Sequence, residues 1–356
     1  MAKFHKLKIS DIRKETSDCV SIAFEIPQNL SKEYQYIQGQ YLTLKVFKDN
    51  TEYRRSYSLC SSPISDSECR IAAKEVVGGA VSPWLNKTLK VGDEIEVMTP
   101  MGNFHTPIIP NQSKNYLLFA GGSGITPIYS IIKTVLHVES NSSITLFYAN
   151  KNENSIIFDK AIKDLTEKHA NRFKLYNILE NGQNPQFTGI LTHEKTIQLL
   201  QTYVEITKID DIFICGPAPM MENIKTALLS QQVNENKIHI EYFTTVLNDL
   251  KKQNDVVISE AVTSSVTIVL DGDETMLSLN TNGISVLDAA QNAGVDVPFS
   301  CKGAVCCTCK AKVTEGKAKM DMNYALTDQE VEEGFILTCQ AHPITEKLTV
   351  DYDQAF

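Results

Sequence analysis

Residues 301–309 read CKGAVCCTC, a loop that places Cys301, Cys306 and Cys309 in a C-x4-C-x2-C spacing. A fourth cysteine, Cys339, follows thirty positions after the third. Small residues at 303 and 304 let backbone N–H groups approach a group held inside such a loop. We therefore predict that Cys301, Cys306, Cys309 and Cys339 are metal ligands and that the loop wraps around the metal centre.

The spacing of these four cysteines is typical of plant-type [2Fe–2S] clusters, in which four thiolates are shared by two irons. A zinc site and buried free thiols are the alternatives. Zinc sites favour CxxC pairs, and the loop contains one such pair, Cys306 with Cys309. Cys307 lies off the spacing, so we interpret it as a packed thiol rather than a ligand.

The chain on either side of this loop divides into segments with different periodicities. Residues 4–100 contain short alternating runs such as HKLKIS and YLTLKVF, which predict a small antiparallel barrel. From Asn115, strands alternate with helices, which predicts a doubly wound parallel sheet. A polar stretch, NDLKKQNDVVISEA, is typical of a linker. The predicted segments are the barrel at 1–110, the α/β domain at 111–247, the linker at 248–261 and the cysteine-loop domain at 262–356.

Charge and composition narrow the class of protein. The 356 residues carry 34 Lys and Arg against 43 Asp and Glu, which gives no support for nucleic acid as a partner. The N-terminus has no signal-peptide core, and no apolar run approaches the roughly 18 residues of a membrane span, so we expect a cytoplasmic protein. Residues 262–356 hold 6 basic and 14 acidic side chains. This acidic end predicts a docking surface for a partner protein, with a solvated polar face as the alternative.

Three further motifs are suited to binding phosphate groups and cofactor rings. RRSYSL at 54–59 is followed by KEVVGGAVS at 74–82, whose glycine turn can hold phosphate oxygens. GGSGITP at 121–127 follows a buried strand and opens a helix, which is typical of a phosphate loop. CGP at 215–217 ends the strand DIFIC, where a parallel sheet delivers residues to its ligand crevice.

Taken together, these motifs resemble the ferredoxin–NADP reductase superfamily joined to a C-terminal plant-type ferredoxin domain. The resemblance implies a multidomain protein with an antiparallel β-barrel for FAD, a doubly wound α/β domain for the nicotinamide and an α+β β-grasp domain for the [2Fe–2S] cluster. It implies that Arg55 meets the FAD pyrophosphate, Tyr57 packs along the isoalloxazine and the Ser58 hydroxyl reaches the N5 edge. The flavin-binding residues expected are Arg55, Ser56, Tyr57, Ser58, Lys74, Val76, Gly78, Gly79 and Ser82.

The same resemblance implies roles around the nicotinamide. Cys215 would lie beside the carbon that gives up hydride, although a buried strand-end thiol is the plainer alternative. Phe243 would cover the flavin, with an ordinary core aromatic as the alternative. Lys151 could meet a 2′-phosphate, which favours NADPH while leaving NADH possible. The catalytic residues expected are Ser58, Cys215 and Phe243, and the nicotinamide-binding residues are Gly121, Gly122, Gly124, Thr126, Pro127, Lys151, Cys215, Gly216 and Pro217.

These expectations describe one electron path. NADPH gives a hydride to FAD, which splits the pair and passes single electrons to the cluster and on to an oxygenase such as a diiron enzyme. Two other enzymatic interpretations are a general ferredoxin or flavodoxin reductase and the reductase of another hydroxylase or desaturase. A non-catalytic redox sensor is the remaining alternative, although a sensor would not need all three binding motifs.

Overall fold

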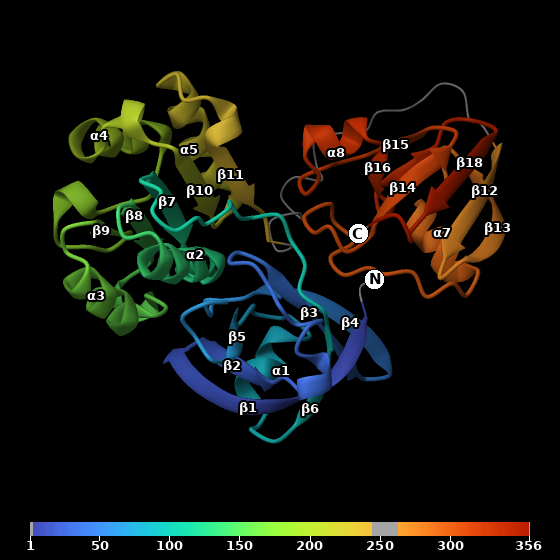
Figure 1. The fold of residues 1–356 in the computed structure, drawn as a ribbon, viewed down its shortest axis with the longest axis horizontal. Helices are drawn as coiled ribbons and strands as arrows, with labels where there is room; N and C mark the ends of the chain where they lie inside the picture. The colour runs from blue at the N-terminus through green and yellow to red at the C-terminus, as the bar shows by residue number, and fades with distance from the viewer. Residues whose placement is uncertain (1–2, 244–262, 356) are drawn as a thin grey trace. The chain divides into compact units, whose positions relative to one another are not determined.

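The computed structural model describes residues 3–243 and 263–355. It divides into two compact units, the larger of which comprises Phe4–Tyr53 and Tyr57–Tyr242. The smaller unit contains the C-terminal sheet (Figure 1). The predicted linker at 248–261 lies outside the described residues, and the domain boundaries drawn from the sequence stay predictions.

The N-terminal sheet has six strands in the order β4-β3-β6-β1-β2-β5. An isolated bridge between Leu59 and Ile71 joins the end of β4 to β5, so the two edge strands meet. Leu7, Ile22 and Val97 are fully buried in the core that the sheet encloses. The predicted antiparallel barrel is therefore confirmed. Its strands are β1 (Phe4–Thr16), β2 (Cys19–Glu25), β3 (Tyr41–Lys48), β4 (Thr51–Ser58), β5 (Cys69–Lys74) and β6 (Glu94–Met98), and the short helix α1 (Ser82–Lys87) follows β5.

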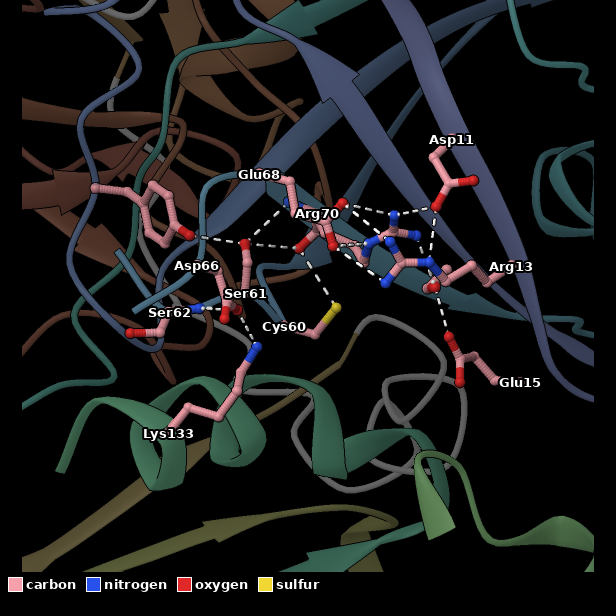
Figure 2. A network of polar contacts seen from close by, with 12 residues as sticks. Asp11, Arg13, Glu15, Cys60, Ser61, Ser62, Asp66, Glu68, Arg70 and Lys133 are labelled. Carbon is pink, nitrogen blue, oxygen red and sulfur yellow. Dashed lines mark hydrogen bonds and ion pairs between the residues drawn. The ribbon is translucent and has the colours of Figure 1, made fainter. Parts of the chain in front are cut away.

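A buried arginine ties three barrel strands together (Figure 2). The Arg70 side chain on β5 is 5% exposed and donates to Asp11 on β1 at 2.5 Å and to Ser21 on β2 at 3.0 Å. It also donates to Glu68 Oε1 at 2.8 Å. These hydrogen bonds lower the pKa of both carboxyl groups. A buried guanidinium is tolerated only when it is paired in this way, so the network holds β1, β2 and β5 in one register.

The second sheet is parallel, in the order β11-β10-β7-β8-β9. Helices α2 and α3 cover one face and α4 and α5 cover the other (Figure 1). The strand order reverses between β7 and β10, which makes their carboxyl ends the switch point of a doubly wound sheet. The elements are β7 (Asn115–Gly121), α2 (Ile125–Val138), β8 (Ser143–Asn150), α3 (Asp159–Lys168), β9 (Phe173–Leu179), α4 (His193–Tyr203), β10 (Asp211–Cys215), α5 (Ala218–Ser230) and β11 (Ile238–Glu241).

The third sheet is mixed, in the order β13-β12-β18-β14-β16, with β12 and β18 parallel. Helix α7 packs Val286 and Leu287 against Val266 and Val350 in its core. This arrangement confirms the predicted β-grasp fold. Among the described residues, no helix is long and apolar enough to cross a membrane. The elements are β12 (Thr263–Leu270), β13 (Asp273–Asn280), α7 (Val286–Asn292), β14 (Lys310–Glu315), β15 (Ala318–Met320), α8 (Asp328–Glu332), β16 (Phe335–Leu337), β17 (Ala341–Pro343) and β18 (Lys347–Asp351).

Candidate functional site

The two glycine-containing loops predicted from the sequence lie against each other at the switch point. Cys215 at the end of β10 pairs with Ala120, next to the last residue of β7. A Cβ atom on Gly124 would lie 2.0 Å from the Cys215 carbonyl oxygen, and one on Gly121 would lie 2.7 Å from Pro217 Cδ. The contact between the loop at 121–124 and the loop at 215–217 is therefore possible only because both glycines lack a side chain.

Two hydrogen bonds, one from Tyr148 of β8 and one from Thr126 of α2, fix the loop at 121–124. Gly122 adopts a φ of +52°, and the fully buried Tyr148 donates its hydroxyl hydrogen to the Gly122 carbonyl at 3.1 Å. Thr126 Oγ1 donates to the carbonyl of Ser123 at 3.0 Å. The loop then leads into α2, whose first N–H groups have no partner within the helix. A glycine turn at a helix start suits a dinucleotide pyrophosphate, so these residues fit a nicotinamide cofactor.

A serine, a glutamate and a cysteine meet beside these loops. Ser58, at the end of β4, donates to Glu241 Oε2 at 3.1 Å, and Glu241 pairs with Cys215 across β11 and β10. Burial, with Glu241 close by, raises the pKa of Cys215 well above its ordinary value. Cys215 is therefore a neutral thiol, which suits packing against a ring and excludes a thiolate nucleophile. Sequence reasoning proposed Ser58 and Cys215 but missed Glu241, because only the register of β11 brings that carboxyl group to them.

Burial raises the pKa of Glu241 to about 8, and the hydrogen bond from Ser58 opposes that rise. The carboxyl group is therefore mostly protonated at neutral pH. In this state the Glu241 carboxyl group can give up its proton and the Ser58 hydroxyl can pass one on to it, so the pair is able to move a proton at Ser58 Oγ.

The raised pKa of Glu241 predicts how stability depends on pH. The folded protein keeps a proton that the unfolded chain releases, so the free energy of unfolding falls as pH rises from 4.5 through about 8. Glu241→Gln cannot ionise at this position, and we expect its free energy of unfolding to fall by about 4–5 kcal/mol less than that of the parent across this range. Urea unfolding of flavin-free protein at both ends of the range measures the difference. Identical pH dependence in parent and variant would show that Glu241 titrates normally.

The residues predicted to hold the flavin lie at the end of β4 and in the turn after β5. Tyr57 packs on the barrel core, whereas Arg55 is exposed and donates to the Arg54 carbonyl at 2.8 Å. Ser82 Oγ accepts a hydrogen bond from the Val76 N–H at 3.0 Å and so closes the turn. The other predicted flavin residues are Ser56, partly exposed; Lys74, which reaches Asp18 at 3.6 Å; Val76, 42% exposed; Gly78, with φ of +75°; and Gly79, whose N–H donates to Val76.

The remaining predicted residues of the cofactor site follow strand ends. Lys151 is exposed directly after β8, at the carboxyl edge of the parallel sheet. Thr126 and Pro127 are buried in the first turn of α2. A Cβ atom on Gly216 would lie 3.0 Å from the Cα atom of Gly121, so the two glycines are in close contact. Phe243 is partly buried, two residues beyond β11.

The four cysteines predicted as ligands form two pairs in the C-terminal unit. Cys301 and Cys306 bring their Sγ atoms within 3.1 Å of each other, and Cys309 is hydrogen-bonded to Cys339. Two thiol pairs suit a two-iron cluster, in which each iron takes two protein sulfurs. The loop wraps by placing Lys302 and Ala304 at positive φ, and the Gly303 N–H donates to Cys301 Sγ at 3.3 Å.

Cys307 has a hydrogen-bond partner outside these pairs. Its thiol donates to the Ala325 carbonyl at 3.4 Å, and its side chain is buried. This geometry agrees with its interpretation as a packed thiol.

Each of the three sheets lies in a segment of the chain that matches a known protein family. Residues 6–106 match the oxidoreductase FAD-binding domain and residues 118–226 match the oxidoreductase NAD-binding domain. Residues 268–343 match the 2Fe-2S iron-sulfur cluster binding domain. Together with the full-length relatives described next, which are reductase components of oxygenases, these matches show that the chain belongs to the family of oxidoreductases that pass electrons from NAD(P)H through FAD and a [2Fe–2S] cluster to oxygenases.

The sequence similarity to known relatives covers nearly the whole chain. The chain is 38% identical to one subunit of 1,2-phenylacetyl-CoA epoxidase from Escherichia coli (strain K12), over 99% of both proteins. It is 33% identical to the ferredoxin reductase component of 3-ketosteroid-9-alpha-monooxygenase from Rhodococcus rhodochrous, over 97% of this chain and 96% of the relative. Among solved structures, phthalate dioxygenase reductase superimposes over 98% of both chains with a TM-score of 0.58 and 22% identity, which supports the fold.

Proposed function

We propose that this reductase supplies electrons to an oxygenase of the phenylacetyl-CoA epoxidase type. The observation that carries the proposal is the 38% identity to one subunit of that enzyme along the whole chain. NADPH is the proposed donor, because Lys151 stands exposed after β8 where a 2′-phosphate would lie. All nine cysteines lie within the described residues and none is in a disulfide, which agrees with a cytoplasmic location.

We place hydride transfer between Ser58 and Cys215. FAD, when bound, accepts the hydride and gives up electrons one at a time. The Ser58 hydroxyl would face the N5 edge, and through its hydrogen bond to Glu241 it would pass on the single proton that the flavin releases for every two electrons it gives up. The neutral Cys215 would pack on the nicotinamide carbon without attacking it, and Phe243 would cover the flavin when the nucleotide is absent.

The oxygenase would dock on the acidic turn that surrounds α8. Asp328, Glu332 and Glu333 are exposed there. Glu330 of the same helix reaches Lys310 at 3.2 Å, and Lys310 directly follows the ligand Cys309. The acidic surface is thus adjacent to the cluster loop, where a short electron path to a basic partner surface would begin.

Reconstitution tests the proposed partner. The purified reductase, the oxygenase component of phenylacetyl-CoA epoxidase and NADPH should convert phenylacetyl-CoA to its epoxide, with a rate that falls as salt screens the acidic surface. The triple change of Asp328→Asn, Glu332→Gln and Glu333→Gln should lower epoxidation and leave ferricyanide reduction unchanged. Absence of epoxide, while ferricyanide is still reduced, would assign the reductase to a different acceptor.

A further inference from the structure

A second set of hydrogen bonds joins the barrel to α2, away from the Ser58–Glu241 contact. The loop after β4 contributes Ser61, Ser62 and Asp66, and α2 contributes Ser130, Lys133 and Thr134. We call these six residues the seam. Ser130, Lys133 and Thr134 are spaced i, i+3 and i+4, so they share one face of the helix.

Four of the six seam residues are buried, and members of the seam are hydrogen-bonded to one another. Ser130 Oγ donates to the Ser61 carbonyl at 2.6 Å, and the Ser62 and Thr134 hydroxyl oxygens lie 2.9 Å apart. Ser62, Ser130 and Thr134 are fully buried. Because the Thr134 hydroxyl donates to the Ser130 carbonyl at 2.7 Å, the Ser62 hydroxyl supplies the hydrogen between the two elements.

An ion pair closes the seam. Lys133 reaches from α2 to Asp66, whose carboxylate also accepts from the Ser62 N–H at 2.8 Å (Figure 2). The Lys133 and Asp66 side chains are 15% and 26% exposed, so both partners of this pair are partly withdrawn from solvent. Such hydrogen bonds depend on angle as well as distance, so they define the register of the loop and the helix in a way that apolar packing would not.

Both sides of the seam lead within a few residues to the reaction site. Ser61 lies three positions after Ser58 on the same strand end. Helix α2 begins at the glycine loop, where Gly124 abuts the backbone of Cys215. The seam therefore adds a polar contact between the barrel and the parallel sheet to two others, the hydrogen bond from Ser58 to Glu241 and the edge-to-face packing of Phe104 on Phe213.

We infer that Ser62, Lys133 and Thr134 are positioning residues for hydride transfer, which hold the glycine loop and Cys215 at a set distance from Ser58. The inference rests on the proposed placement of the transfer between Ser58 and Cys215. A displacement near 1 Å can cost about 100-fold in rate, so a partial loosening of the seam should be visible in the chemical step before it is visible in folding.

The test measures flavin reduction by anaerobic stopped flow at saturating nucleotide, with the nucleotide that the parent prefers, normalised to bound FAD. Thr134→Val keeps the shape of the side chain and removes its hydroxyl, and Lys133→Met removes the charge. We expect each to slow flavin reduction by about tenfold, with the half-saturating nucleotide concentration changed by less than about threefold. A deuterated nucleotide should give an isotope effect at least as large as in the parent, because hydride transfer limits the rate.

Lys45→Met is the matched control. Lys45 is 14% exposed and pairs with Glu96 at 3.1 Å between β3 and β6, so its loss breaks an equally buried ion pair inside the barrel. Flavin reduction in this variant should stay within about twofold of the parent. Rates in Thr134→Val and Lys133→Met that match the control, or a change in half-saturation alone, would overturn the inference.

Two more variants separate this inference from the proposed site. Ser58→Ala and Cys215→Ala should slow flavin reduction whether or not the seam matters. If they do and the seam variants do not, only the seam fails. If Ser58→Ala and Cys215→Ala react at the parent rate, the placement of hydride transfer is wrong, and the seam loses its role with it.

Discussion

Replacing Cys306 by serine is expected to remove the iron–sulfur cluster and leave the flavin half of the protein working. Cys306 is 4% exposed, and its Sγ atom lies 3.1 Å from that of Cys301. It belongs to the C-terminal unit, which has an apolar core of its own besides those of the barrel and the parallel sheet. The variant should still reduce ferricyanide with NAD(P)H, because that acceptor takes electrons from flavin directly. It should lose at least about 95% of electron transfer to a one-electron protein acceptor, since that path passes through the cluster.

Arg55→Ala is the counterpart to this variant. It should lose FAD and both activities while its iron content stays near that of the parent. Iron, sulfide and FAD analyses measured alongside the two activities decide the result. Reduction of the protein acceptor at the parent rate by Cys306→Ser would mean that electrons leave from the flavin and that the ferredoxin domain is not the exit.

Adding one methyl group at Gly124 should nearly abolish hydride transfer. A Cβ atom there would meet the Cys215 carbonyl oxygen at 2.0 Å and the Gly216 nitrogen at 2.8 Å, and backbone cannot move aside as a flexible side chain can. The glycine loop and Cys215 must therefore separate in Gly124→Ala. We expect flavin reduction to fall by at least about 100-fold, with FAD retained, because no flavin-binding segment is touched.

Gly122→Ala provides the matched comparison. It adds the same methyl group to the same loop, but no other atom lies within 4 Å of the added Cβ atom. The only cost is the backbone strain of placing alanine at a φ of +52°. This strain is worth about 1–2 kcal/mol, so the variant should bind nucleotide more weakly and remain far more active than Gly124→Ala. Equal losses in the two variants, measured by stopped flow with thermal unfolding as a check, would show that contact with Cys215 is not what Gly124 provides.

The folds could be predicted well from the sequence because their signals are local. The cysteine spacing, the alternation at 4–100 and the strand–glycine–helix order after Asn115 each depend on neighbouring residues. The elements that were not anticipated carry weak local patterns. The helix at His193–Tyr203 buries only three side chains, and the strands at Ala318–Met320 and Ala341–Pro343 are three residues long and form by pairing with each other.

The site was predicted less completely, because part of it depends on long-range pairing. Ser58 and Cys215 belong to recognisable motifs, whereas Glu241 is brought to Ser58 from 183 positions away. Tyr148 and the seam residues could not be predicted either, because a tyrosine in a strand or a serine in a helix belongs to no recognisable sequence motif. Within the cluster loop, the small residues at 303 and 304 were expected to let backbone N–H groups approach the metal centre, and the Gly303 N–H does donate to Cys301 Sγ. The positive φ angle at Lys302 was not expected, because a lysine carries no signal for it.

The order in which the two redox centres are reduced is the sharpest test of the electron path. Anaerobic protein mixed with NAD(P)H should show flavin bleaching first and loss of cluster absorbance afterwards, at a rate no faster than the flavin step. Protein stripped of FAD, with its four cysteine ligands and cluster intact, should keep the cluster oxidised under the same conditions. Reduction of the cluster at the parent rate in flavin-free protein would contradict the proposed electron path from nicotinamide through flavin to [2Fe–2S].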